Sequence, residues 1–134
     1  MLRLSKADKL CSRTKIEELF ASGQSFVSFP LRVVYRIHDK KKDEEKHQFF
    51  INVPKRKFKK AVKRVWLRRR IREAYRLHQD LLPSDSLKTL DIAFLYISPE
   101  KSEFAMIERK MIEALNRLSA ALTKESNRSN ISKS

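Results

Sequence analysis

Arginine occupies every fourth position within the segment KRVWLRRRIREAYR at residues 63–76. The repeated positions are Arg64, Arg68, Arg72 and Arg76. Residues spaced by four lie on one side of an α-helix, where like charges repel each other. Guanidinium groups offer planar, bidentate donors that suit phosphate oxygens. The segment therefore predicts a helix whose repulsion is offset by binding to a polyanion.

Most of the positive charge of the chain lies around this segment. The 134 residues carry a net charge of +15, and residues 55–76 hold twelve Lys or Arg against one acid, Glu73. A concentrated basic patch is typical of a nucleic-acid-binding surface. The competing interpretation is a solvated helix face on which Glu73 pairs with Arg69, although such a face normally mixes both signs.

Residues that could perform catalysis by themselves do not form a recognisable set. His38, His47 and His78 are scattered, and the acids are not clustered. The sequence therefore predicts no catalytic residue and no metal site in the protein itself, which argues against an autonomous nuclease. Cys11 is the only cysteine, so no internal disulfide is expected. No apolar run suits a membrane span or a signal peptide, and we expect a cytoplasmic protein.

The elements that must position the basic segment alternate between helices and strands. Apolar spacing predicts a helix at 14–21, strand at 25–37 with a break or an edge position at Pro30, strand at 48–53, a long helix at 58–82, strand at 90–97 and a last helix N-capped at Ser98-Pro99. The fold class is α+β, with a small mixed sheet of about four strands flanked by helices in the order α-β-β-β-α-β-α. One domain is expected over residues 1–122, with a hairpin loop at 38–47 and a disordered tail at 123–134.

The long helix is predicted to have a core-facing side and a polyanion-facing side. The core-facing stripe consists of Leu67, Ile71, Ala74, His78 and Leu81. These residues recur at intervals of three and four, as an amphipathic helix requires.

Trp66 and Arg69 both lie off this stripe. Arg69 is placed on the far side of the helix, and Trp66 lies between the arginine row and Arg70. The indole could stack on a nucleic-acid base, or it could pack against a neighbouring strand. A long basic helix among strands favours shape-directed RNA binding over a helix-turn-helix that reads DNA.

Residues 58–76 resemble the signature helix of the protein subunit of bacterial ribonuclease P. That signature runs Ala-Val-x-Arg-Asn-Arg-Ile-Lys-Arg-x-x-Arg-Glu, and the matching positions are Ala61, Val62, Arg64, Arg68, Arg69, Arg72 and Glu73. Val65 stands where the family usually has Asn, and Trp66 stands where it usually has Arg. The segments IEELFASGQSF and INVPKRKFKKAV are also similar to the family, so the resemblance covers roughly residues 8–122.

The resemblance implies the accessory protein subunit of an RNA-containing endoribonuclease. In that family the RNA subunit performs metal-dependent hydrolysis and removes the 5′ leader of precursor tRNA. The protein binds the catalytic RNA and binds the single-stranded leader in a cleft between the sheet and a flanking helix. The implied partners are ribonuclease P RNA and precursor tRNA, with no membrane and no obligate protein partner. Mg²⁺ is expected for the holoenzyme, with no cofactor held by the protein alone.

The resemblance also assigns expected roles to individual residues. Contacts with the RNA subunit are expected from Lys55, Arg56, Lys57, Lys60, Lys63, Arg64, Arg68, Arg69, Arg72 and Arg76. Contacts with the leader are expected from Phe20, Tyr35 and Trp66, and ordinary core packing is the competing interpretation for the first two. The alternative functions are a non-catalytic ribosome-associated or general RNA-binding module, and a DNA-binding regulator.

Overall fold

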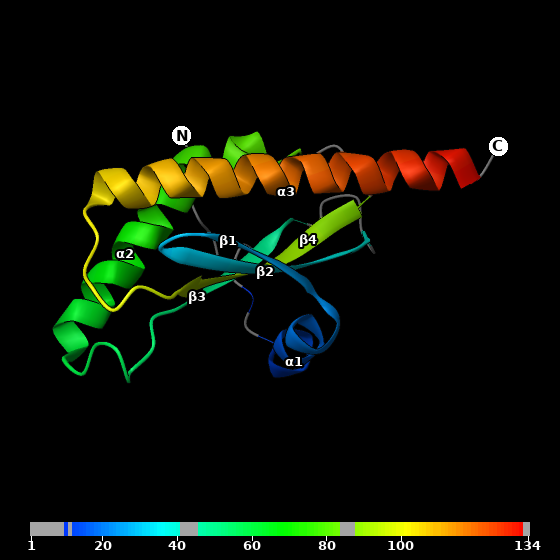
Figure 1. Cartoon of the computed structure of the whole chain (residues 1–134). Coiled ribbons are helices and arrows are strands. Elements are labelled where there is room, and N and C mark those ends of the chain that lie inside the picture. The colour runs from blue at the N-terminus through cyan, green and yellow to red at the C-terminus, as the bar shows by residue number, and fades with distance from the viewer. Residues whose placement is uncertain (1–9, 11, 41–45, 84–87, 133–134) are drawn as a thin grey trace.

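Helices cover both faces of a four-stranded sheet (Figure 1). The computed structural model describes the backbone of residues 10, 12–40, 46–83 and 88–132, with side chains as far as residue 125. The strands are β1 (Gln24–Ser28), β2 (Leu31–Asp39), β3 (Gln48–Asn52) and β4 (Lys88–Tyr96). The helices are α1 (Arg13–Ser22), α2 (Ala61–His78) and α3 (Phe104–Ser132), with a 3-10 turn η2 (Gln79–Leu81) after α2. The predicted α+β class and element order are confirmed.

The strand that the sequence marks as apolar on both faces is in the interior of the sheet. The strand order is β1-β2-β4-β3, and β4 pairs antiparallel with β2 and parallel with β3. Ile92, Ala93 and Phe94 of β4 are all fully buried. Because β4 lies between β2 and β3, the hairpin predicted across residues 38–47 is wrong. Residues 41–45 of that segment lie outside the described chain.

Pro30 divides the stretch that precedes this loop into two strands. The peptide bond between Phe29 and Pro30 is cis, and these two residues form the turn between β1 and β2. The two strands pair antiparallel, with Ser28 opposite Leu31. The predicted break at Pro30 is confirmed.

Two hydrophobic clusters hold the helices to the sheet. The larger cluster lies between the sheet and helices α2 and α3, where the ring of Phe49 packs 4.2 Å from that of Tyr75 between centroids. The smaller cluster lies under α1 and includes Leu19, Val34 and Ala93. Burial of these apolar side chains fixes α1 on one face of the sheet, with α2 and α3 on the other (Figure 1).

Helix α1 ends at Ser22 and is followed by Gly23, a position where a side chain would not fit. The N–H of Gly23 donates to the carbonyl of Leu19 over 2.8 Å. A Cβ at Gly23 would lie 2.3 Å from that same oxygen and 2.9 Å from the carbonyl oxygen of Tyr35. The φ angle is −76°, so glycine is needed here for close backbone approach rather than for a left-handed conformation. Its place lets the chain pass directly from α1 into β1.

Helix α2 buries most of its predicted stripe. Leu67, Ile71 and Ala74 are fully buried as expected, and Tyr75 joins them at 2% exposure. Leu81 is instead 37% exposed, so its predicted core position is wrong. The α-helix gives way at Gln79 to a 3-10 turn, which has fewer residues per turn and rotates the following side chains away from the stripe. Leu82 occupies the core in its place.

Helix α3 differs from the expectation at both ends. It begins at Phe104 rather than after Ser98, whose hydroxyl instead accepts a hydrogen bond from the N–H of Glu100 over 3.1 Å. The backbone stays helical to Ser132, although a disordered tail was predicted from Thr123. Residues 123–132 contain no Gly or Pro, the residue types that most strongly disfavour a helix interior.

Candidate nucleic-acid interface

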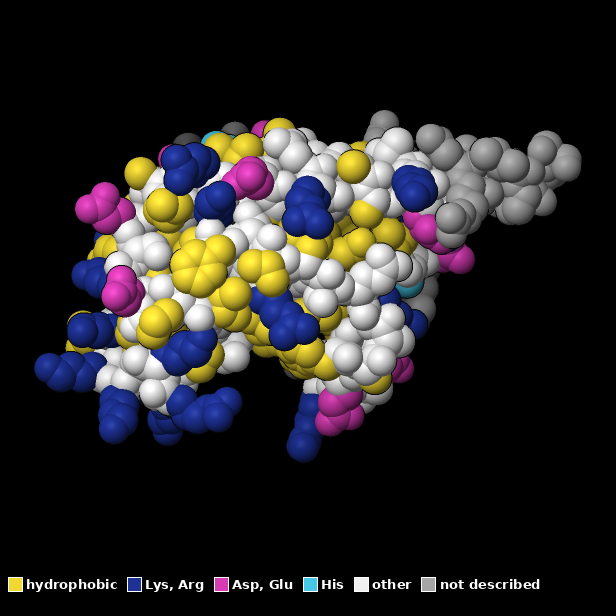
Figure 2. Space-filling view, viewed as in Figure 1, with side chains coloured by type: hydrophobic (Ala, Val, Ile, Leu, Met, Phe, Trp, Pro, Cys, Tyr) yellow, Lys and Arg dark blue, Asp and Glu magenta, His cyan; other side chains and the backbone are white. Residues whose placement is uncertain are grey.

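The outer side of α2 presents the predicted row of arginines. Arg68, Arg69 and Arg72 are exposed, while Leu67 and Ile71 on the opposite side are fully buried. Figure 2 shows Lys and Arg side chains gathered at the left and lower left of the molecule, over α2 and the loop that enters it. The hydrophobic side of α2 thus anchors a helix whose other side is free to meet phosphates.

Two members of the predicted row have partners within the protein. Arg64 Nη1 donates to the carbonyls of Phe58 and Lys59, over 2.7 Å and 2.9 Å. Arg76 donates to both carboxylate oxygens of Glu73, over 2.5 Å and 2.9 Å. The hydrogen bond from Arg76 holds the pKa of Glu73 below its ordinary value. Glu73 therefore pairs with Arg76. The solvated-face interpretation required it to pair with Arg69 instead.

The loop between β3 and α2 extends the basic surface. Lys55, Arg56, Lys57 and Lys60 are exposed on it, and Lys63 follows on the first turn of α2. The guanidinium of Arg64 holds this loop through the two carbonyls that it binds. The loop and the helix therefore form one continuous cationic surface.

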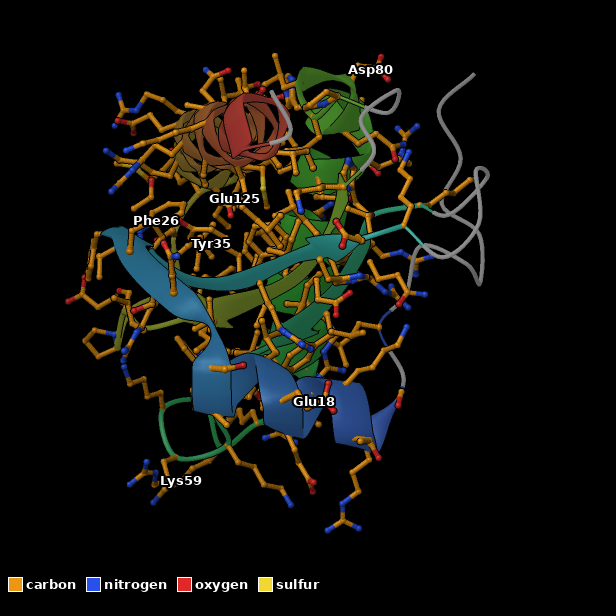
Figure 3. All side chains as sticks on the ribbon, turned by 90° about the vertical axis from the view of Figure 1, so that its right-hand side faces the viewer. Glu18, Phe26, Tyr35, Lys59, Asp80 and Glu125 are labelled. Carbon is orange, nitrogen blue, oxygen red and sulfur yellow. The ribbon has the colours of Figure 1, made fainter. Side chains whose placement is uncertain are left out.

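Phe20 and Tyr35 lie on opposite faces of the sheet. Phe20 is 48% exposed on α1, and its ring packs edge-on against Phe50 at 5.9 Å between centroids. Tyr35 packs against Phe26 at 5.9 Å, and its hydroxyl donates to Gln24 Oε1 over 2.9 Å. Figure 3 shows Phe26 and Tyr35 on the side of the sheet that faces α3, away from α1. The prediction that Phe20 and Tyr35 line one cleft is therefore wrong.

The residues that share the α1 face with Phe20 come from the strands. Side chains alternate along β2, so Arg32 lies on the same face as Val34, beneath α1. Phe50 of β3 lies on this face opposite Ala93 and is half-buried. The polar character of alternate β2 residues was visible in the sequence, but the helix that covers this face was not.

Trp66 is half-buried at the edge of the larger hydrophobic cluster. Two cations lie close to its ring: the guanidinium carbon of Arg70 is 5.0 Å from the ring centroid, and the ammonium of Lys101 is 4.0 Å from it. The indole therefore packs at the edge of the core and faces charged groups. It lies on α2, in a different layer from Phe20 on α1.

The titratable side chains in the described part of the chain do not form a metal site. No group of three or more His, Cys, Asp or Glu side chains among them could hold a metal ion. Two of the histidines pair with acids: His78 Nε2 lies 2.9 Å from Glu108, and His38 Nε2 lies 3.2 Å from Asp91. Within the same residues, no helix is both long enough and apolar enough to cross a membrane.

His47 connects the start of β3 to the start of β4. Its Nε2 donates to the carbonyl of Pro83 over 2.7 Å, and its Nδ1 accepts from the N–H of Leu90 over 3.0 Å. This pattern requires a neutral ring, because one nitrogen donates and the other accepts. Burial lowers the pKa of His47 below its ordinary value of 6.5.

We expect the free energy of unfolding to decrease as the pH falls below about 6.5. In this range the unfolded chain binds a proton at His47 that the folded chain does not, so acid favours unfolding. The contribution of His47 to this slope has an upper limit of about 1.4 kcal/mol per pH unit, which corresponds to one proton. Urea unfolding between pH 7.5 and pH 5 measures this slope. His47→Gln should flatten it relative to a His78→Gln control, and equal slopes in both variants would rule out His47 as the source.

The chain is similar in sequence to known proteins along most of its length. Residues 4–119 match the family model described as Ribonuclease P. The chain is 39% identical over 119 residues to the ribonuclease P protein component of Porphyromonas gingivalis, across 86% of this chain and 85% of that protein. The protein from a second strain, W83, matches to the same extent.

Solved structures share the fold. The RNase P protein from Thermotoga maritima superposes with a TM-score of 0.66 and 24% identity, over 81% of this chain and 96% of that one. The RNase P protein of Staphylococcus aureus superposes with a TM-score of 0.61 and 19% identity, over 85% of this chain and 96% of that one.

Proposed function

Because this chain belongs to the ribonuclease P protein family, we propose that it binds ribonuclease P RNA through α2 and the 5′ leader of precursor tRNA through the α1 face. The RNA subunit then carries out the endonucleolytic removal of the leader, which leaves the mature 5′ end of the tRNA. The cytoplasm, where precursor tRNA is transcribed, is the compartment in which this function would be needed.

The observation that best supports this function is that α2 has one side buried in the core and exposed arginines on the other. Arg68, Arg69 and Arg72 point away from a side of α2 that is completely buried. Their backbone positions are therefore fixed before RNA arrives, which reduces the entropy lost on binding. Each guanidinium can donate two parallel hydrogen bonds to one phosphate.

The contribution of the protein to the reaction is electrostatic. Arginines and lysines that neutralise RNA phosphates release condensed counterions. The folded RNA with the protein bound therefore needs a lower concentration of dissolved cations. Mg²⁺ is expected for the RNA-containing holoenzyme, as membership of the ribonuclease P family implies. The hydrolytic step itself belongs to the RNA.

Leader binding is assigned to the sheet face beside α1. Phe20 offers an exposed aromatic ring next to Phe50, and such rings stack on unpaired bases without sequence preference. Arg32 is exposed on the same face and would meet the leader backbone. Tyr35 lies on the other face of the sheet and has no place in this assignment.

Reconstitution tests this function directly. Precursor tRNA and the ribonuclease P RNA of the source organism are combined at a Mg²⁺ concentration too low for the RNA to act alone, and the protein is then added. Accurate 5′ cleavage that requires the protein is the expected result. Absence of stimulation together with tight binding to unrelated RNAs would instead favour a general RNA-binding module.

A further inference from the structure

Lysines from three separate segments surround a pocket beside the start of α2. The pocket has a volume of about 470 Å³. Its lining consists of Lys57, Phe58, Lys59, Lys60, Lys63, Pro99, Glu100 and Lys101. The loop before α2, the first turn of α2 and the segment between β4 and α3 each contribute at least one lysine. The sequence predicts RNA contacts for Lys57, Lys60 and Lys63, but not for Lys59 or Lys101.

Contacts within the protein hold these three segments together. Lys57 Nζ donates to the carbonyl of Ile97, which joins the loop to the end of β4. Arg64 donates to two carbonyls of the same loop. Lys101 lies with its ammonium 4.0 Å from the centroid of the Trp66 ring, a distance at which the indole face attracts a cation. These contacts therefore fix the positions of the three segments that line the pocket.

The charges around the pocket favour an anionic occupant. Five lysines and one acid, Glu100, are among the residues that line it. Like charges at this density repel each other, and a bound anion removes the repulsion. Figure 3 shows Lys59 reaching away from the sheet into solvent, where an extended polyanion could meet it. A volume of this size falls in the range of ordinary ligand sites, which suits one or more phosphodiester groups.

We propose that this pocket binds phosphodiester groups of ribonuclease P RNA, with Lys101 as a direct phosphate contact and Trp66 as the residue that positions Lys101. This inference rests on the function proposed above. Lys63, Trp66 and Arg70 form the flank of α2 opposite to that of Arg68 and Arg72. The RNA surface thus extends across both flanks of the helix and onto the β4–α3 segment.

Lys101→Ala in the full-length protein tests the phosphate contact. Equilibrium binding to ribonuclease P RNA is measured over a series of KCl concentrations. We expect affinity to fall about tenfold and the slope of log K against log[salt] to become shallower by about 0.7–0.9. Lys124→Ala, which removes an exposed lysine on α3, should change neither quantity. Thermal unfolding should be the same for both variants and the wild type.

Trp66→Leu tests the positioning role, because it keeps an apolar side chain and removes the aromatic face. It should weaken binding about as much as Lys101→Ala, and adding Lys101→Ala to it should have little further effect. Lys101→Arg should retain affinity. Additive losses from the two substitutions would overturn the positioning role of Trp66.

The remaining outcomes separate this inference from the proposed function. If wild-type protein binds the RNA and Lys101→Ala binds equally well, the pocket proposal fails and the function stands. If Lys101→Ala raises only the KM for precursor tRNA, the phosphates come from the substrate, and the assignment to the RNA subunit is overturned. If wild-type protein does not bind the RNA, the proposed function fails, and the inference fails with it.

Discussion

A triple substitution of Ala for Arg68, Arg69 and Arg72 is expected to weaken binding to ribonuclease P RNA by at least about 100-fold. Each side chain is exposed on the outer side of α2, and each can form charge-assisted hydrogen bonds with a phosphate. Three such contacts contribute more than this factor if they are independent, and the lower figure allows for partial compensation. The free energy of unfolding should stay within about 0.5 kcal/mol per substitution, as is usual for exposed positions.

A variant with the same net charge separates local contacts from general attraction. Lys46→Ala, Arg109→Ala and Lys124→Ala remove three exposed positive charges elsewhere on the surface. Binding to the RNA and protein-dependent cleavage at low Mg²⁺ are then compared among the two triple variants and the wild type. A similar loss in both variants would mean that the arginine face of α2 has no special role.

Ile71→Ala is expected to lower the free energy of unfolding by about 2–5 kcal/mol. Ile71 is fully buried in the larger hydrophobic cluster, where α2 meets the sheet and α3. Removing its side chain leaves a cavity that close-packed neighbours fill only in part. Urea unfolding followed by circular dichroism measures the change, provided that the m-value shows that the transition remains two-state.

Arg69→Ala is the matched control for Ile71→Ala on the same helix. It should unfold like the wild type, since Arg69 is exposed and lies across the helix from the core. The pair therefore tests the phasing of α2 directly. If Arg69→Ala were strongly destabilised and Ile71→Ala were not, the assignment of buried and RNA-facing sides would be reversed.

Features set by neighbouring residues in the chain could be predicted from the sequence. The α2 stripe of Leu67, Ile71 and Ala74 follows from helical periodicity, and the outward position of Arg69 follows from the same period. The interior position of β4 follows from its being apolar on both faces. Strand pairing could not be predicted in this way, because the insertion of β4 between β2 and β3 depends on contacts far apart in sequence.

The candidate site shows the same division. The arginine row is local to one helix and was predicted. The separation of Tyr35 from Phe20 was not, because the alternation along β2 does not say which face of the sheet α1 covers. The approach of Lys101 to Trp66 was also invisible, because it depends on the path of the segment between β4 and α3.

The position of β4 in the sheet has a consequence for how the chain folds during synthesis. β1 and β2 are antiparallel neighbours joined by a tight turn, so they can pair as soon as both have left the ribosome. β3 pairs with β4, which is made only after the whole of α2. The nascent basic helix thus emerges before the sheet that buries its apolar side is complete. Native docking of α2 therefore has to await the emergence of β4 and then of α3, against which α2 also packs, so the RNA-binding surface becomes rigid only when most of the chain has been made.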